Sequence, residues 1–215
     1  MTLRLPGQWV WDSWYAFDGE NHHAFYLQAS RALGDPDRRH RHPSIGHAIS
    51  SDLKNWKVVA DAIAVGDEPE FDAWTTWTGS VVRDDSGLWW MFYTGGSRAN
   101  QNGLAQAVGA ATSTDLITWT KVETNPLTEA DGRWYEKLGD STWFDEAWRD
   151  PWVFRLPGDS TWHMLITARA NHGEVINRGV IGHATSTNLR DWQVVEPLSK
   201  PEAGFGQLEV LQYAV

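Results

Sequence analysis

The sequence predicts an all-β fold in which a four-stranded unit is repeated, and three observations support this. One twelve-residue segment occurs three times, with a glycine and a tryptophan ten residues apart in every copy. Each copy follows two apolar stretches bounded by polar or glycine-containing turns, so each repeat holds four candidate strands. No stretch combines a long 3.6-residue apolar period with helix caps. Such units at a near-constant period are typical of a β-propeller, whose units are its blades.

The first predicted blade covers about residues 8–66, the second 69–127 and the third 134–199. The repeated segments are 45–56, 108–119 and 181–192, and each is interpreted as a strand, a Ser/Thr-Asp/Asn turn and a further short strand that a tryptophan begins. Those tryptophans, Trp56, Trp119 and Trp192, are expected to fill the core between blades. The strands upstream of the repeated segments are expected at 9–15, 24–29, 79–83, 88–94, 150–155 and 162–167.

Residues 205–215 are interpreted as the innermost strand of a fourth blade. Three blades and one strand would leave apolar edges without partners. The sequence therefore predicts one β-propeller domain over residues 1–215 that is incomplete at its C-terminus, either as a fragment or with a second chain or symmetry mate supplying the missing blades. A β-sandwich, the alternative fold, does not explain the recurring glycine-to-tryptophan segment.

Composition and charge exclude several classes of protein. The formal charge of −10 argues against a nucleic-acid surface, and the one basic cluster, residues 38–41, is short. There are no cysteines, so disulfides and thiolate zinc sites are excluded. No apolar run is long enough for a signal peptide or a membrane span, which predicts a soluble, cytoplasmic protein unless a leader was removed. Most of the fifteen tryptophans are expected in the core, and a minority at a pocket mouth would offer flat apolar faces on which sugar rings can stack.

Alignment of the copies on their glycines indicates a shared pocket. It brings Asp12, Thr78 and Asp150 to equivalent places on the innermost strands, and Glu209 is expected to follow on the next blade. Because innermost strands surround one axis, three carboxylates would meet there, a pairing useful for acid chemistry. Such a trio in an aromatic pocket suits glycoside cleavage. The histidines at 22, 23, 40, 42 and 47 are interpreted as solvated, and neither a metal nor a cofactor is expected.

Four short motifs resemble those of the five-bladed furanosidases of glycoside hydrolase families 32 and 68, which include invertases, levanases and levansucrases. They are, in chain order, Val10-Trp11-Asp12-Ser13-Trp14, Trp77-Thr78-Gly79-Ser80, Arg149-Asp150-Pro151 and Gly206-Gln207-Leu208-Glu209. The Arg-Asp-Pro triplet is the most specific of these. The resemblance spans residues 10–210, and it implies a five-bladed domain.

The resemblance also implies roles for individual residues. Asp12 would be the nucleophile, Glu209 the general acid and base, and Asp150 would hold the fructosyl hydroxyls with Arg149 beside it. The residues implied to line the sugar subsite are Trp11, Trp77, Thr78 and Ser80. Two features depart from the pattern: Thr78 stands where a serine is usual, and Glu209 lacks the Cys-Pro that follows it in family 32.

Three functions remain open at this stage. The first is a retaining hydrolase or fructosyltransferase that acts on β-fructofuranosides such as sucrose and short fructans. The second is an inverting arabinan- or xylan-directed furanosidase of family 43 type, in which the carboxylates stand roughly 6.5–9.5 Å apart instead of about 5 Å. The third is a non-catalytic sugar-binding or assembly propeller. All three have a carbohydrate as the partner, with no nucleic acid and no membrane.

Overall fold

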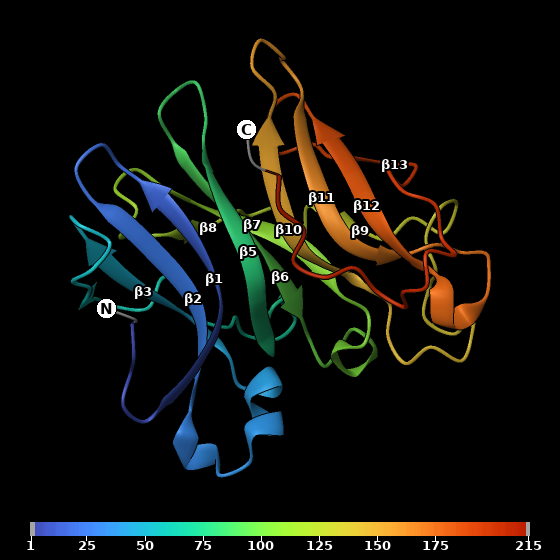
Figure 1. Ribbon diagram of the computed structural model, residues 1–215, viewed down its shortest axis with the longest axis horizontal. Coiled ribbons are helices and arrows are strands. Elements are labelled where there is room, and N and C mark those ends of the chain that lie inside the picture. Colours follow the sequence, from blue (N-terminus) through green and yellow to red (C-terminus); the bar gives the residue numbers. More distant parts are fainter. Residues whose placement is uncertain (1–2, 214–215) are drawn as a thin grey trace.

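The computed structural model describes residues 3–213 and folds them into three antiparallel sheets that lie side by side (Figure 1). The first sheet contains β1 (Gln8–Phe17), β2 (His22–Ser30), β3 (Ser44–Ser50) and β4 (Lys57–Val58). The second contains β5 (Thr75–Arg83), β6 (Trp89–Gly96), β7 (Ala107–Ser113), β8 (Thr120–Lys121) and, beside β7, the short β9 (Thr128–Glu129). The third contains β10 (Trp148–Arg155), β11 (Trp162–Arg169), β12 (Gly179–Ser186) and β13 (Gln193–Val195).

This arrangement confirms the predicted all-β fold of four-stranded blades. In every sheet the four main strands follow one another in sequence order, and each pairs antiparallel with its neighbour. The first strands, β1, β5 and β10, contact one another in that order, as expected of the inner strands of adjacent blades.

The repeated turn forms in all three copies, and its side chains make the same hydrogen bonds. Ser50 and Asp52, Ser113 and Asp115, and Ser186 and Asn188 are the bonded pairs. The Asp or Asn oxygen also accepts two backbone N–H groups further along the turn. A Ser-x-Asp/Asn pattern thus closes the turn locally and positions the tryptophan, which lies one residue before the last strand and does not begin it as predicted.

The hydrophobic core lies between the sheets. The strand β6 is buried on both of its faces, which explains the apolar run in the sequence of the second sheet. Alternate residues of a strand face opposite sides. Trp89, Met91 and Tyr93 pack toward the first sheet, whereas Trp90 and Phe92 pack toward the third. A strand buried on both faces needs apolar residues at every position, and each residue of β6 is buried.

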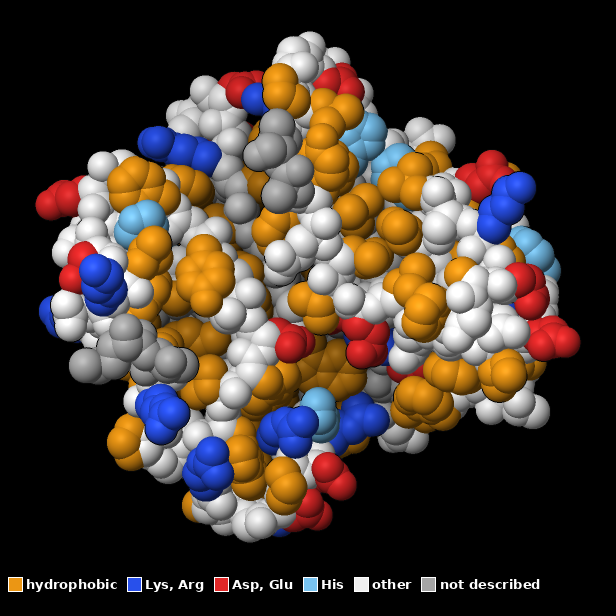
Figure 2. All heavy atoms as spheres, in the orientation of Figure 1, with side chains coloured by type: hydrophobic (Ala, Val, Ile, Leu, Met, Phe, Trp, Pro, Cys, Tyr) orange, Lys and Arg blue, Asp and Glu red, His pale blue; other side chains and the backbone are white. Residues whose placement is uncertain are grey.

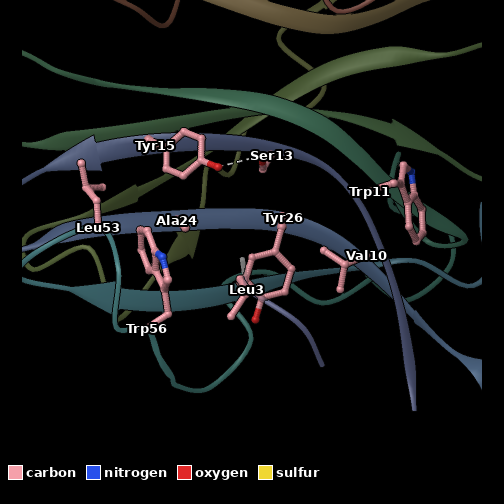
Figure 3. A pocket seen from close by; sticks show the side chains of 9 residues that line it. All are labelled: Leu3, Val10, Trp11, Ser13, Tyr15, Ala24, Tyr26, Leu53 and Trp56. Atoms are coloured by element: carbon pink, nitrogen blue, oxygen red, sulfur yellow. Dashed lines mark hydrogen bonds between the residues drawn. The ribbon is translucent and has the colours of Figure 1, made fainter. Parts of the chain in front are cut away.

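Two of the repeated tryptophans pack between blades as predicted. Trp119 meets Phe25 of the first sheet edge-on, with ring centroids 5.7 Å apart, and Trp192 meets Phe92 of the second sheet at 5.5 Å. Trp56 differs, because no other sheet lies on its side of the first blade in the described chain. It lines an open groove of about 500 Å³ with Tyr15 and Tyr26 (Figure 3).

The expected inner strand at 205–215 is not formed over its described part, residues 205–213. A strand needs a neighbour for its backbone groups, and this segment bonds to scattered partners. Gly179 N–H donates to the Phe205 carbonyl at 2.9 Å, and the Trp152 indole donates to the Tyr213 carbonyl at 3.2 Å. This part of the prediction was wrong. The remaining expected residues, 214 and 215, lie outside the described ones.

In the described part of the chain the helical residues form four short 3₁₀ segments: η1 (Arg31–Leu33), η2 (Pro36–Arg41), η3 (Gln101–Gly103) and η4 (Val175–Asn177). Within residues 3–213, none of these helices has the length and apolar character that a bilayer crossing requires. The first two belong to the connection between β2 and β3, which hangs below the first sheet (Figure 1).

Candidate active site

The first strand of each sheet is interrupted at the residue that the sequence singled out. Pairing of β1 with β2 shifts register between Val10 and Ser13, and pairing of β5 with β6 shifts between Trp77 and Gly79. The third shift lies between Arg149 and Trp152. Such β-bulges redirect side chains and are common next to active sites. Here the bulges lie at Asp12, Thr78 and Asp150, which occupy equivalent positions on the three inner strands. The side chains of these residues therefore need not follow the regular alternation between the two faces of the sheet.

One cavity of about 660 Å³ collects these residues. Seven of the eight predicted site residues line it: Trp11, Asp12, Trp77, Thr78, Arg149, Asp150 and Glu209. Other lining residues are Leu27, Arg39, His40, Arg41, Gln106, Phe144, Asp145, Gln207 and Val210. The described structure therefore brings the three predicted carboxylates together, although 197 residues of sequence separate the first from the last.

The carboxylate of Asp12 is oriented by the neighbouring blade. The hydroxyl of Thr78 on β5 donates a hydrogen bond of 2.6 Å to Asp12 Oδ2. A hydrogen bond to an ionised acceptor is short and roughly twice as strong as a neutral one. The threonine that stands where the resemblance leads one to expect a serine supplies a hydroxyl of the same kind for this contact.

Asp150 is the most deeply buried of the three carboxylates. Its backbone has a φ of +58°, in the left-handed region that residues with a side chain adopt infrequently and at a cost in energy. Two threonines hold it there: Asp150 N–H donates to Thr94 Oγ1 at 2.8 Å, and Thr167 Oγ1 donates to Asp150 Oδ2 at 2.9 Å. Burial raises the pKa of Asp150 to about 6, although Arg149 favours its ionised form.

Arg149 joins Glu209 to a fourth carboxylate that sequence reasoning missed. Its Nη2 donates to Glu209 Oε1 at 2.6 Å, while its Nη1 donates to Asp145 Oδ2 at 3.1 Å and to Gln106 Oε1 at 2.9 Å. Gln106 also donates to Asp145 at 3.0 Å. Asp145 and Gln106 are buried, so they fix the guanidinium that faces Glu209. Asp145 precedes Arg149 by only four residues, the one sequence signal that could have identified it.

Ser80 requires a correction, because its side chain does not reach the cavity. It is buried, and its Oγ accepts the backbone N–H of Val153 at 3.0 Å. Ser80 lies two residues after Thr78 along β5 and beyond the bulge, where the strand packs against β10. We therefore assign it to the contact between these two inner strands and not to sugar binding.

The connection between β2 and β3 forms part of the cavity wall, which the sequence did not predict. Arg39, His40 and Arg41 of η2 line the cavity. The indole N–H of Trp77 donates to the His40 carbonyl at 2.9 Å, and the Arg39 guanidinium lies over Trp11 at 5.6 Å. The two predicted sugar-binding tryptophans thus also anchor this segment. The only available signal was that the one basic cluster of an acidic chain follows β2.

The histidines also differ from the prediction. His23 and His47 are buried and bonded to each other, with 2.9 Å between Nδ1 and Nε2, and are not solvated. Burial, together with the smaller effect of neighbouring His23, lowers the pKa of His47 to about 4. The predicted polar surface is therefore partly core: these two rings stack beside Phe25 within the first sheet.

Comparison with known proteins agrees with the fold. The family model described as the glycosyl hydrolases family 32 N-terminal domain matches residues 13–214. Raffinose invertase of Escherichia coli is 30% identical over 211 residues, which cover 94% of this chain and 38% of that protein. The chain therefore spans well under half the length of this relative.

Solved structures with the same fold include two fructan-related enzymes. Fructan 1-exohydrolase IIa from Cichorium intybus superposes with a TM-score of 0.73 at 24% identity, covering 97% of this chain and 35% of that one. Inulosucrase from Halalkalicoccus jeotgali, bound to kestose, superposes with a TM-score of 0.71 at 26% identity, covering 90% and 54%.

Proposed function

We infer the function from the family, because the chain belongs to the glycosyl hydrolases of family 32. We propose that the protein cleaves β-fructofuranosides such as sucrose and short fructans with retention of configuration, passing the fructosyl group to water or to another sugar. The observation that supports this proposal is the meeting of Asp12, Asp150 and Glu209 in one cavity, each carboxylate held by its own donor. Relatives include both hydrolases and fructosyltransferases, which share the first half of this reaction.

In the first step an oxygen of Asp12 attacks C2 of the fructosyl group and forms an ester bond. The bond from C2 to the leaving oxygen breaks, and Glu209, as a carboxylic acid, gives its proton to that oxygen. Thr78 holds Asp12 in the orientation needed for attack. Pre-organisation of this kind supplies much of what a positioned nucleophile contributes to the rate.

In the second step Glu209, now a carboxylate, takes a proton from water or from a sugar hydroxyl. The oxygen of that acceptor attacks C2, the ester bond breaks, and Asp12 regains its charge. Asp150 accepts hydrogen bonds from fructosyl hydroxyls next to the reacting carbon. Bonds of this kind strengthen as positive charge develops on the sugar ring in the transition state.

The nucleophile assignment is tested with Asp12→Asn and sucrose. We expect fructose release to fall at least about 10³-fold, since the amide cannot form the ester intermediate while its shape is unchanged. Exposed Asp67 provides the control, because Asp67→Asn makes the same chemical change away from the cavity and should leave the rate unchanged. Full activity in Asp12→Asn would refute the assignment.

Stereochemistry separates the retaining mechanism from the inverting alternative. With methanol as the acceptor, retention yields the methyl β-fructofuranoside, whereas inversion yields no β product. Nuclear magnetic resonance identifies the anomer, because a methyl glycoside, unlike free fructose, does not interconvert between anomers in solution. Binding of sucrose without turnover by the unaltered protein would favour the sugar-binding alternative instead.

A further inference from the structure

The segment that carries Glu209 reaches the cavity without belonging to a sheet. Residues 205–209 form no strand, so no ladder of backbone hydrogen bonds fixes the position of the Glu209 carboxylate. In Figure 1 the end of the chain, in red, follows an irregular path beside β10, and Figure 2 shows acidic side chains around a hollow near the middle of the same face. Asp12 and Asp150, by contrast, lie on strands. Contacts other than those of a sheet must therefore hold the proposed acid in place.

Arg169, the last residue of β11, binds this segment with a buried side chain. The side chain is only 1% exposed, and each of its three guanidinium nitrogens donates a hydrogen bond. Nη1 donates to the carbonyl of Gly206, Nη2 donates to the carbonyl of Val175 at 2.6 Å, and Nε donates to the carboxylate of Glu136. One guanidinium thus connects the chain, three residues before Glu209, to η4 and to a buried carboxylate.

Trp143 packs against both Arg169 and Gly206. The guanidinium lies over the Trp143 ring, 3.7 Å from its centroid, which is close for a cation–π contact. A side chain at Gly206 would not fit, because an added Cβ would lie 2.6 Å from a carbon of this ring. The glycine therefore permits the segment to approach the ring closely enough for its carbonyl to meet Arg169.

The buried carboxylate of Glu136 has two arginine partners. Its Oε2 accepts from Arg169 and its Oε1 accepts from Arg178. The other side-chain hydrogen bond of Arg178 goes to the Gly173 carbonyl at 2.9 Å, and within residues 3–213 none goes to the segment 205–209. Either arginine can therefore be replaced while Glu136 keeps one partner, and only Arg169 connects this pair to the segment that carries the acid.

We propose that Arg169 is a positioning residue for the reaction: by binding the Gly206 carbonyl, it holds Glu209 where an acid can protonate the leaving oxygen. This inference rests on the proposed function for the role of Glu209. The Glu209 side chain is 55% exposed, and within residues 3–213 its carboxylate has one hydrogen-bond partner, Arg149. A group with a single contact stays in the orientation for proton transfer only if its backbone is fixed as well.

The test compares two substrates that share the fructosyl group and differ in whether the leaving group needs a proton. The glucosyl part of sucrose leaves as an alkoxide unless an acid protonates its oxygen, whereas β-fructofuranosyl fluoride releases fluoride, a weak base that leaves without that proton. In Arg169→Met we expect kcat/KM to fall about 10- to 100-fold for sucrose and less than about threefold for the fluoride, since a general acid contributes about 10²–10⁴-fold. The comparison uses kcat/KM because this constant reports the steps up to the ester, in which the acid acts.

Matched variants connect this pattern to the position of the acid. Glu209→Gln removes the acid itself and should show the same pattern with a larger loss for sucrose. Arg178→Met removes the other partner of Glu136 and should leave the ratio of the two kcat/KM values unchanged. Arg169→Lys keeps the charge beside Glu136 but supplies one nitrogen in place of three, so we expect an intermediate loss for sucrose.

Gly206→Ala tests the same contact from the side of the segment and leaves Arg169 unaltered. The added methyl group would meet the ring of Trp143, so the segment must move away from the guanidinium. We again expect a loss of kcat/KM for sucrose that is larger than the loss for the fluoride. If Arg169→Met does not fold, this variant decides: a loss confined to sucrose supports the proposal, and equal losses refute it.

Two results with Arg169→Met would overturn the proposal: an unchanged kcat/KM for sucrose, or equal losses for both substrates, since the arginine would then only support the fold. Equal losses in Glu209→Gln would instead refute Glu209 as the acid, which is a failure of the proposed function. If the unaltered protein turns over neither substrate, amide hydrogen exchange of residues 205–209 decides. Faster exchange in Arg169→Met than in Arg178→Met supports Arg169 as the residue that holds the segment, and equal exchange refutes it.

Discussion

Asp150 shows how a single residue can weaken the fold in order to serve a site. Its carboxyl is buried, and burial raises its pKa from 3.8 to about 6. Because the folded state holds this proton more tightly than the unfolded chain does, stability falls as the pH rises from about 4 to about 6. Above about pH 6 Asp150 is charged in the folded protein, and the unfolding free energy is lowered by the full cost of burying that charge. Below about pH 4 Asp150 is protonated in both states, and the cost is absent.

Asp150→Asn should therefore stabilise the protein at neutral pH. The shift of about two units sets an upper limit of roughly 3 kcal/mol on the gain in unfolding free energy at pH 7.5, since each unit corresponds to about 1.4 kcal/mol. At pH 3.5 the gain should vanish. Urea denaturation at both pH values measures it, and an equal gain at both would contradict the buried charge as its cause.

Asp145→Asn provides a comparison of opposite sign. It removes a carboxylate from the buried guanidinium of Arg149, which then depends on Glu209 and Asp150 alone for compensation. Removing one partner of a buried pair leaves an uncompensated charge and is destabilising. The two substitutions together distinguish Asp150, whose charge lowers the stability of the fold, from Asp145, whose charge stabilises it.

At the scale of elements, the repeated turn carries the same backbone strain in every copy. Its leucine has a positive φ each time: 58° at Leu53, 61° at Leu116 and 66° at Leu189. A left-handed conformation costs an L-residue roughly 1–2 kcal/mol, and asparagine tolerates it better. Leu116 and Leu189 are buried, whereas Leu53 is exposed. The burial of its side chain offsets the strain in two copies and not in the first.

Leu53→Asn and Leu116→Asn should therefore differ in sign. In the exposed copy we expect a gain of about 0.5–1 kcal/mol in unfolding free energy, because strain is relieved and little apolar surface is lost. In the buried copy we expect a loss of about 3 kcal/mol, because a core leucine is removed and a polar amide is buried. Denaturant unfolding measures both, and a loss at Leu53 would refute the strain argument.

The elements also mark how far the sequence could predict the structure. The three sheets and their turns were predictable because the repeat records one local solution three times. The presence of Asp12 and Asp150 in the same cavity was predictable from that repeat. The absence of a strand over residues 205–213 was not predictable, because strand formation depends on a neighbouring strand to pair with. The role of η2 escaped prediction for another reason: an exposed polar segment has no periodicity, and its place beside Trp11 and Trp77 arises from tertiary contacts.

On the scale of the whole molecule, the same aromatic contact recurs between the first and second sheets and between the second and third. Each is a tryptophan from the end of one sheet against a phenylalanine on the second strand of the sheet before it: Trp119 with Phe25 and Trp192 with Phe92. The inner strands that carry Asp12, Thr78 and Asp150 belong to three different sheets. The geometry of the cavity therefore depends on how the sheets pack and not on any one of them alone.

Trp119→Ala and Trp192→Ala should each destabilise the protein by about 3 kcal/mol, the usual cost of removing a large aromatic from a core. Trp56→Ala makes the same chemical change on the groove side of the first sheet, where Trp56 lines an open groove with first-blade residues such as Tyr15 and Tyr26 (Figure 3). This substitution should cost under about 1 kcal/mol. Urea denaturation gives the three values. Since Trp119 and Trp192 belong to separate core clusters, their effects should add within about 0.5 kcal/mol in the double variant. A cost at Trp56 equal to the other two would show that a partner covers this face in solution.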